Sequence, residues 1–121
     1  MDYLYIDNNT ALEHAMARCL KAPVVAVDTE FARFNTYYPM VGLLQIGVGS
    51  VNYLIDPLAI SDLSGLKALF LQPETLKVVH AGSEDMEVFQ HWLGCLPSPL
   101  LDTQIAAAML GIGYSMSYQK L

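Results

Sequence analysis

The apolar run at residues 24–27, which leads directly into Asp28, Thr29 and Glu30, constrains the fold more than any other stretch of the chain. A strand this apolar is normally buried in a sheet whose two faces are both covered. Side chains alternate across a strand, so Asp28 and Glu30 point to one face and Thr29 points to the other. The sequence therefore predicts a buried strand over 24–31 that carries two carboxylates on one face.

Two explanations fit this pair of acids. Carboxylates on one face, about 6–7 Å apart, repel each other, and leaving them beside an apolar core is costly unless a cation joins them. Hard divalent cations such as Mg²⁺ or Mn²⁺ prefer carboxylate oxygens as ligands. Alternatively, the strand emerges into solvent at Asp28, and the two acids form a hydrated strand end. The spacing alone leaves both explanations open.

The rest of the chain alternates between patterns typical of strands and of helices. In chain order, the patterns predict a short strand over 2–6, a helix over 11–21 with Thr10 as N-cap, strands over 41–49 and 51–56, a helix over 63–71 with Asp62 or Ser61 as N-cap, a strand over 76–81, a helix over 83–93 with Ser83 as N-cap, a short strand over 99–103 and a helix over 103–111 closed by Gly111. A β-meander followed by alternating helices and strands predicts an α/β layer fold with a mixed sheet.

Composition excludes several classes of protein. Hydrophobic residues make up 54% of the 121 residues and charged residues only 15%, which excludes a disordered chain. No apolar stretch approaches the roughly 20 residues that span a bilayer, so we expect no membrane association. The N-terminus has no basic region typical of a signal peptide, and Cys19 and Cys95 fit no metal-binding spacing. We therefore expect a cytoplasmic protein with reduced thiols.

The net charge of −6 limits how the chain can meet a phosphate group. It arises from 6 basic and 12 acidic residues, which argues against a basic surface that binds nucleic acid directly. It does not argue against an enzyme in which acidic residues hold metal ions, because there the cation meets the phosphate.

Asp85 is a third acid that the pattern directs inward. It falls in the first turn of the helix predicted over 83–93, where an acid also favours the helix dipole without any ligand. However, Asp85 shares a helical face with Phe89 and Trp92, which the helix would bury against the sheet. We therefore expect Asp85 to lie near Asp28 and Glu30 and to complete a metal site with them.

The other polar candidates have simpler explanations. Asp102 directly precedes a predicted helix, where Asp is a good N-cap. His80 ends a predicted strand and is expected to be a hydrogen-bonded packing residue, while His14 and His91 lie on predicted helix surfaces. No Ser-His-Asp or Cys-His arrangement and no P-loop is present. The Gly-Ile-Gly at 111–113 follows a helix rather than a strand, so it is not a dinucleotide-binding motif.

Four segments of the chain closely resemble the ribonuclease D family. They are DTEF at 28–31, LLQIG at 43–47, HAGSED at 80–85 and LDTQIAA at 101–107. That family belongs to the DEDD group of 3′–5′ exonucleases, and the resemblance covers essentially the whole chain in order. It implies a ribonuclease H-like fold, with a mixed sheet and flanking helices in a truncated form.

The resemblance also implies a mechanism and a substrate. In this group, four carboxylates hold two divalent ions, Mg²⁺ or Mn²⁺; one helps to generate hydroxide and the other stabilises the leaving 3′ oxygen. Asp28, Glu30 and Asp85 match three of the four acids, as both catalytic residues and metal ligands. Phe31 matches an aromatic position that touches the terminal base, although a core position is the alternative. The implied partner is the 3′ end of RNA, typically a transfer RNA precursor.

One motif of the family is missing from the chain. The family has a tyrosine followed four residues later by the fourth aspartate, but no Asp or Glu follows Asp102 here, and Tyr114 is followed at that spacing by Tyr118. We therefore expect residues 1–121 to be the N-terminal part of a 3′–5′ exonuclease domain, without the family's C-terminal helical domains. We also expect little or no activity from this chain alone, and self-association through apolar surface that further helices would cover.

Two other hypotheses remain open from the sequence. The first is a non-catalytic nucleic-acid-binding or interaction module on the same fold. The second is a structural domain that binds no metal and exposes its acids. Metal titration separates the enzyme from the structural domain, and RNA binding separates the two alternatives from each other.

Overall fold

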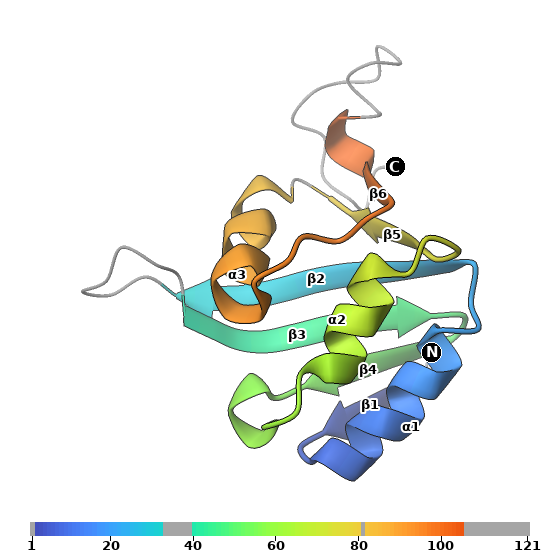
Figure 1. The fold of residues 1–121 in the computed structure, drawn as a ribbon, viewed down its shortest axis with the longest axis vertical. Coiled ribbons are helices and arrows are strands. Elements are labelled where there is room, and N and C mark those ends of the chain that lie inside the picture. The colour runs from blue at the N-terminus through green and yellow to red at the C-terminus, as the bar shows by residue number, and fades with distance from the viewer. Residues whose placement is uncertain (1, 33–39, 81, 106–121) are drawn as a thin grey trace.

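The computed structural model describes residues 2–32, 40–80 and 82–105 (Figure 1). The elements in chain order are β1 (Asp2–Ile6), α1 (Asn9–Cys19), β2 (Val24–Ala32), β3 (Met40–Val48), β4 (Val51–Ile55), the short 3-10 helix η1 (Pro57–Ala59), α2 (Ser64–Leu71), β5 (Leu76–Val79), α3 (Ser83–Leu93) and β6 (Leu100–Asp102). Residues 103–105 begin a helix, and the rest of the helix predicted over 103–111 lies outside the described residues.

The strands form one mixed sheet in the order β1-β4-β3-β2-β5-β6. Strand β3 runs antiparallel to its neighbours β2 and β4, and the remaining neighbouring pairs are parallel. The meander β2-β3-β4 and the later alternation of helices and strands confirm the predicted fold class. This order places β2, which carries the acids, between β3 and β5 near the middle of the sheet.

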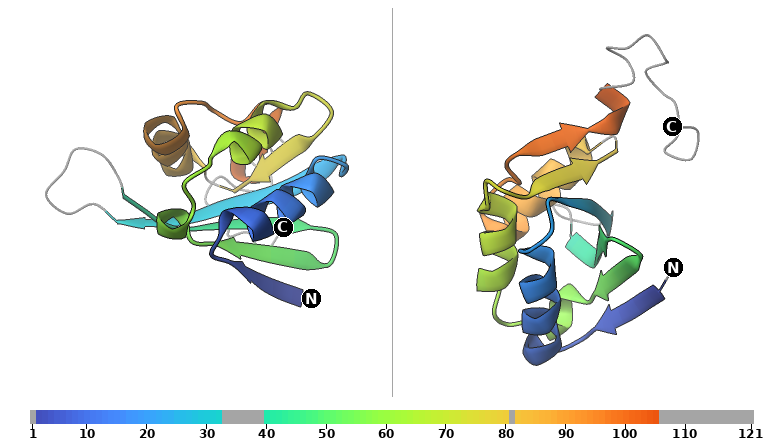
Figure 2. Two further views of the ribbon diagram at one scale, coloured as in Figure 1. Left: turned by 60° about the horizontal axis from the view of Figure 1, so that its bottom comes forward. Right: turned by 90° about the vertical axis from the view of Figure 1, so that its right-hand side faces the viewer.

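Helices α1, α2 and α3 pack on one face of the sheet (Figures 1 and 2). The core between the helices and the sheet includes Leu12, Met16, Val25, Val27, Leu44, Ile46, Leu66, Phe70, Phe89 and Leu93. Burying each such Leu or Phe contributes about 1.5–3 kcal/mol. The rings of Phe70 and Phe89 meet edge to face with their centroids 4.8 Å apart, which joins α2 to α3.

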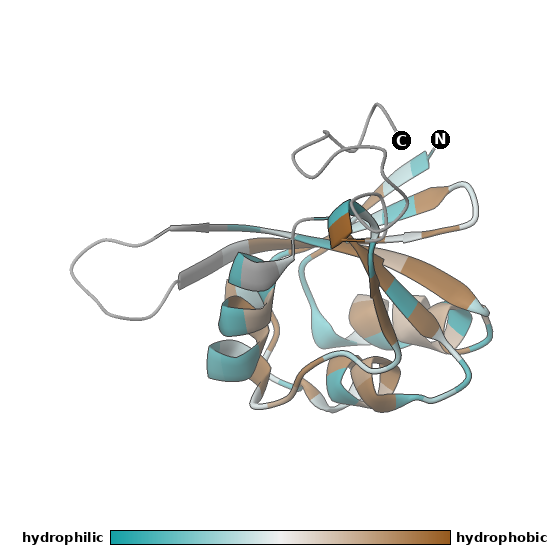
Figure 3. Ribbon diagram, turned by 90° about the horizontal axis from the view of Figure 1, so that it is seen from above, coloured by the Kyte–Doolittle hydropathy of each residue, from teal (hydrophilic) through white to brown (hydrophobic). Residues whose placement is uncertain are grey.

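The opposite face of the sheet has no helix over it within the described part of the chain (Figure 2). Among the described residues, helices cover one of the two faces that the sequence predicts to be covered. On β4, Val51, Tyr53 and Ile55 are buried against the helices, whereas Asn52 and Leu54 between them are only half-buried. Long apolar stretches follow the strands in Figure 3. The sequence of such a strand is a nearly continuous apolar run, but its side chains alternate between buried and half-buried positions.

The helix starts differ from the predicted ones by one or two residues. The N-cap of α1 is Asn8 rather than Thr10, because Asn8 Oδ1 accepts a hydrogen bond from the Ala11 amide at 2.8 Å. At α2, Asp62 accepts hydrogen bonds from the Ser64 amide and hydroxyl, although Leu63 occupies the cap position. At α3, Gly82 occupies the cap position instead of the predicted Ser83.

Two further expectations can be compared with the structure. Cys19 is buried, Cys95 is half-buried, and both are free. No helix within residues 2–32, 40–80 and 82–105 is long and apolar enough to cross a membrane.

Candidate carboxylate site at the end of the central strand

The acids of β2 lie as the alternation predicts. Asp28 and Glu30 are exposed, whereas Thr29 between them is buried with an exposed fraction of 7%. Asp28 also accepts a hydrogen bond from the Thr29 amide at 2.9 Å, which holds its carboxylate close to the strand. The strand therefore presents two acids on the helix-free face and one hydroxyl on the helix-covered face.

The topology brings α3 beside these acids. Strand β5 pairs with β2 only as far as Ala26, and the chain then turns into α3. The first turn of α3 consequently lies next to the part of β2 that continues beyond β5 (Figure 1). Asp85 in that turn is buried, as is Phe89 one turn later, while Glu84 is exposed. The prediction that Asp85 points inward is confirmed.

A hydrogen bond joins Asp85 to the central strand. The Thr29 hydroxyl donates to Asp85 Oδ1, so the carboxylate is held on the helix-covered side of β2. Sequence reasoning missed this role of Thr29. The signal was present, because Thr29 points to the opposite face from Asp28 and Glu30, which is the face that a buried residue of α3 approaches.

Burial and neighbouring charge perturb Asp85. Burial raises its pKa from 3.8 to about 6; the hydrogen bond from Thr29 opposes this rise, and the negative charges of Asp28, Glu84 and Asp102 add to it. A positive ion near this carboxyl would favour its ionised form. A cation beside Asp85 would therefore offset the cost of keeping this buried carboxylate ionised.

The structure does not bring the three predicted ligands together. Asp28 and Asp85 are near enough for their charges to interact, but Asp85 is bonded to Thr29 while Asp28 and Glu30 point to the other face. No three His, Cys, Asp or Glu side chains lie close enough to hold a metal ion in the part of the chain that the structure describes. The roles of the three acids as metal ligands and catalytic residues stay predictions.

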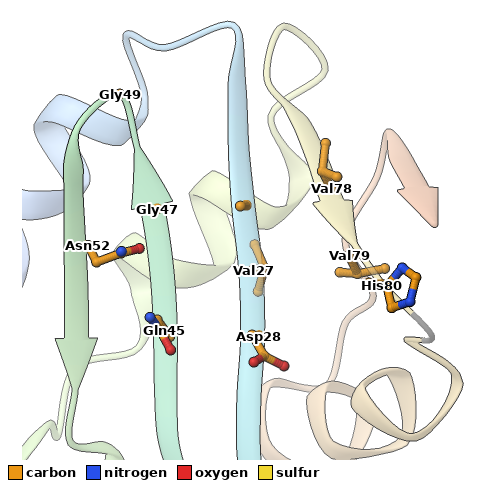
Figure 4. A pocket seen from close by; sticks show the side chains of 10 residues that line it. Val27, Asp28, Gln45, Gly47, Gly49, Asn52, Val78, Val79 and His80 are labelled. Carbon is orange, nitrogen blue, oxygen red and sulfur yellow. The ribbon is translucent and has the colours of Figure 1, made fainter. Parts of the chain in front are cut away.

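A cleft of about 560 Å³ lies on the helix-free face next to Asp28 (Figure 4). Its polar lining comes from Asp28, Gln45, Asn52 and His80. Gly47 keeps the cleft open above β3, because a Cβ at that position would lie 2.9 Å from Asn52 Oδ1. Asp28 thus borders a hollow whose other polar lining groups are amides and an imidazole.

Asp102 and His80 make the kind of contacts that the sequence predicted. Asp102 Oδ1 accepts a hydrogen bond from the Gln104 amide at 2.9 Å, which is an N-cap contact at the start of the following helix. Asp102 Oδ2 also accepts from the Gly82 amide at 2.7 Å, a contact that sequence reasoning did not predict. His80 Nδ1 lies 2.8 Å from Thr103 Oγ1, as expected of a hydrogen-bonded packing residue.

Two parts of the predicted site lie outside the described residues. The backbone of Phe31 belongs to β2, but its side chain is not among the side chains that the structure describes. The stretch in which the third family motif would be sought, residues 106–121, is not described either.

Comparison with known proteins places this geometry in a family. A family model described as 3′–5′ exonuclease matches residues 3–121. Ribonuclease D of Pseudomonas paraeruginosa is 45% identical over 117 residues, which are 97% of this chain and 31% of the relative. The crystal structure of Escherichia coli RNase D has a TM-score of 0.94 and 47% identity, and the match covers 98% of this chain and 32% of that one.

A more distant solved structure agrees. The catalytic core of RRP6 from Trypanosoma brucei has a TM-score of 0.86 at 30% identity, over 93% of this chain and 32% of that one. The chain therefore spans about a third of the length of the relatives that it matches. The resemblance to ribonuclease D and the expected fold are confirmed. Because the family model extends over almost all of its residues, the chain belongs to the 3′–5′ exonuclease family.

Proposed function

We propose that this chain carries part of the active site of a 3′–5′ exoribonuclease, which removes nucleotides from the 3′ end of RNA. The observation that carries the proposal is the buried Asp85, whose pKa is raised to about 6 by burial and by acids that include Asp28, at the end of the central strand. Perturbed carboxyl groups of this kind cluster at catalytic sites. The similar Escherichia coli RNase D is described as an exoribonuclease involved in structured RNA processing.

Asp28, Glu30 and Asp85 would hold Mg²⁺ or Mn²⁺ in this proposal, with two ions in the complete enzyme. Their donors are all carboxylate oxygens, which suit hard divalent cations, and the mutual repulsion of Asp28 and Asp85 would fall when a cation joins them. Such ions polarise a phosphodiester and lower the pKa of bound water. NrnC of Brucella melitensis, 24% identical to this chain with a TM-score of 0.72, was solved with bound Mg²⁺.

The protein's own residues orient this acidic set. The Thr29 amide holds the Asp28 carboxylate, and the Thr29 hydroxyl holds that of Asp85. The register of β2 against β3 shifts between Glu30 and Phe31. The extra residue of this irregularity is Gly42 on β3, because Glu30 pairs with Leu43 and Phe31 pairs with Val41. The bulge therefore lies on the strand beside the acids, and bulges are common next to active sites.

The proposed substrate is RNA with a free 3′ end, and transfer RNA precursors are the class that the resemblance favours. RNase D of Trypanosoma brucei, 23% identical to this chain, was solved in complex with RNA U12. In this proposal Phe31 stacks on the terminal base, because aromatic side chains stack on bases of any sequence.

Cell fractionation with an antibody against this protein would test the cytoplasmic location expected from the sequence.

We further propose that residues 1–121 correspond to the N-terminal part of the exonuclease domain. The chain supplies three of the four family acids, and no Asp or Glu follows Asp102 in its sequence. Three acids do not position two ions and an attacking water, so we expect little or no exonuclease activity from this chain alone. Robust Mg²⁺-dependent trimming of an RNA 3′ end by the 121-residue chain would contradict this expectation.

A metal titration tests the proposed site directly. Mn²⁺ would be added to the parent chain, to Asp28→Ala and to the control Asp62→Ala, with calorimetry and thermal melting as readouts. Asp62 is an exposed acid at the start of α2 and removes the same charge when it is replaced. A ligand at a hundred times its Kd stabilises the folded state by about 2.7 kcal/mol. We expect this stabilisation in the parent and the control, and its loss in Asp28→Ala.

The absence of any Mn²⁺ response in the parent chain would contradict a metal site in this chain. One observation favours the hypothesis of a nucleic-acid-binding module without catalysis: the described acids do not form a three-ligand cluster. That hypothesis predicts that single-stranded RNA binds equally well to the parent and to Asp28→Ala when a chelator is present. The exonuclease proposal predicts that divalent ions strengthen RNA binding by the parent alone.

A further inference from the structure

Asp102, the last residue of β6, connects two segments through the two oxygens of its carboxylate. Oδ2 accepts a hydrogen bond from the Gly82 amide at 2.7 Å, and Oδ1 accepts one from the Gln104 amide at 2.9 Å. An ordinary N-cap serves only the helix that follows it. Asp102 serves that helix and also the start of α3, which begins 20 residues earlier in the chain.

The start of α3 depends on a partner from elsewhere in the chain. Gly82 occupies the N-cap position of α3, and no local side-chain cap is recorded there among the described residues. The site is crowded, since a Cβ on Gly82 would lie 2.6 Å from Val79 Cγ2 and 3.6 Å from Asp102 Oδ2. A carboxylate at a helix N-terminus also interacts favourably with the helix dipole. Asp102 therefore supplies from β6 what the local sequence lacks.

Strand β6 is a firm support for this contact. Asp102 pairs with Val79 in the parallel β5–β6 ladder, and Thr103 Oγ1 lies within hydrogen-bonding distance of His80 and of the Val79 carbonyl. Before the strand, the buried Lys77 donates from Nζ to the Ser98 carbonyl at 3.0 Å. The position of Asp102 is thus set from both sides, and Asp102 in turn sets the position of Gly82.

Asp85 lies three residues beyond Gly82, in the first turn that Asp102 anchors. Two contacts then determine where its carboxylate lies: the Thr29 hydroxyl bonds the side chain, and Asp102 holds the backbone at the helix start. We propose that Asp102 is a positioning residue, which acts through Gly82 to hold Asp85 beside Asp28. This inference rests on the proposed function, in which Asp85 binds metal, and Asp102 itself touches neither the metal nor the RNA.

The test compares Asp102→Ala and Asp102→Asn with the matched control Asp62→Ala. Asp62 also accepts two hydrogen bonds at a helix start, but it lies at α2, away from the site. Hydrogen exchange of the Gly82 amide, followed by NMR, reports the proposed contact, and calorimetry with Mn²⁺ reports the site. Loss of a residue that orients a metal ligand typically weakens metal affinity about 10–100-fold.

We expect Asp102→Ala to accelerate exchange at Gly82 and to weaken Mn²⁺ binding by at least about tenfold. Asp102→Asn, which keeps one acceptor oxygen, should lie between Asp102→Ala and the parent, and Asp62→Ala should change neither readout. If Asp102→Ala does not fold, Asp102→Asn decides the question by the same two readouts. Thermal melting shows that each variant is folded at the temperature of the titration.

A background variant separates positioning from simple loss of charge. Near the site, the Asp102 charge itself attracts a cation, and that attraction would persist in an Asp85→Ala chain. Positioning acts only through Asp85, so Asp102→Ala should have no further effect on Mn²⁺ affinity in the Asp85→Ala background. Undiminished Mn²⁺ affinity in Asp102→Ala, or an equal loss in both backgrounds, would overturn the inference. A parent chain that binds no Mn²⁺ would overturn the proposed metal site and the inference together.

Discussion

The two faces of β2 hold their acids in opposite environments. On the helix-covered face, the carboxylate of Asp85 is buried, and the Thr29 hydroxyl donates a hydrogen bond to it. On the helix-free face, Asp28 and Glu30 are exposed, and Asp28 lines an open cleft. Strand β2 therefore lies between the buried Asp85 on one face and the exposed Asp28 and Glu30 on the other.

This difference indicates what each group would contribute to the proposed metal site. An exposed carboxylate is ionised at little cost and adapts its position easily, whereas a buried carboxylate is fixed in place and sensitive to nearby charge. A cation at the edge of β2 would gain two exposed, adaptable ligands, Asp28 and Glu30, from the helix-free face. It would gain one buried ligand of fixed position, Asp85, from α3. The comparison also predicts that mutations on the two faces affect stability very differently.

The largest difference between the faces should be in packing. Phe89 on α3 is fully buried, and replacing a buried Phe with Ala costs about 3–5 kcal/mol of stability. Leu54 on β4 points to the helix-free face and is only half-buried, so Leu54→Ala should cost about 1 kcal/mol, near the middle of the range for point mutations. Urea unfolding of the two variants measures both. Equal losses would mean that the helix-free face is packed as tightly as the core.

The next effect comes from the charge of Asp85. Its pKa is raised to about 6 in the folded chain from 3.8, so the folded state binds this proton more tightly than the unfolded state. The free energy of unfolding should therefore fall as the pH rises from about 4 to about 6, and the ionised group should cost on the order of 2 kcal/mol at pH 7. Asp85→Asn should then stabilise the metal-free chain at pH 7.

Urea unfolding at low and neutral pH checks the sign of this effect. The gain from Asp85→Asn should vanish near pH 4, where the carboxyl group is protonated in the folded chain. Glu84→Gln is the control, because Glu84 is exposed in the same turn of α3 and should give no such gain. A loss of stability in Asp85→Asn at pH 7 would show that the buried carboxylate is stabilising as it stands.

A smaller effect should follow from removal of the Thr29 hydroxyl. Thr29→Val keeps the shape of the side chain but leaves Asp85 with one hydrogen bond fewer, which should cost about 1 kcal/mol or somewhat more at neutral pH. Thr29→Ser keeps the hydroxyl and should restore Mn²⁺ affinity relative to Thr29→Val. If Thr29→Val binds Mn²⁺ as tightly as the parent, the contact with Asp85 does not matter for the site.

The local parts of this arrangement could be predicted from the sequence. Alternation along β2 placed Asp28 and Glu30 together, and the helical spacing to Phe89 turned Asp85 inward, because both follow from the geometry of a single element. Helix starts were less certain, since Asn8 and Thr10 are both good N-caps and only the folded backbone chooses between them.

The contacts between distant segments could not be predicted. The bond from Thr29 to Asp85 spans 56 residues, and the bond from Gly82 to Asp102 spans 20. Both depend on how far β5 runs beside β2 before the chain turns into α3, and no periodicity in the sequence sets that length. For the same reason, the sequence predicted that three acids meet, but it did not predict that one of them is drawn to the other face.

The weakest expected effect is self-association through the helix-free face. Tyr3 on β1 and Val24 on β2 are apolar residues with exposed fractions of 61% and 46%. Strands β4 and β3 separate them, and each adds apolar surface through which copies can meet. The mass measured by light scattering should rise with protein concentration, and Tyr3→Ser combined with Val24→Ser should reduce that rise. Leu58→Ser is the control, because Leu58 is 88% exposed but lies in η1 rather than on a strand. A parent chain that stays monomeric at all concentrations would show that this face is hydrated well enough to remain uncovered.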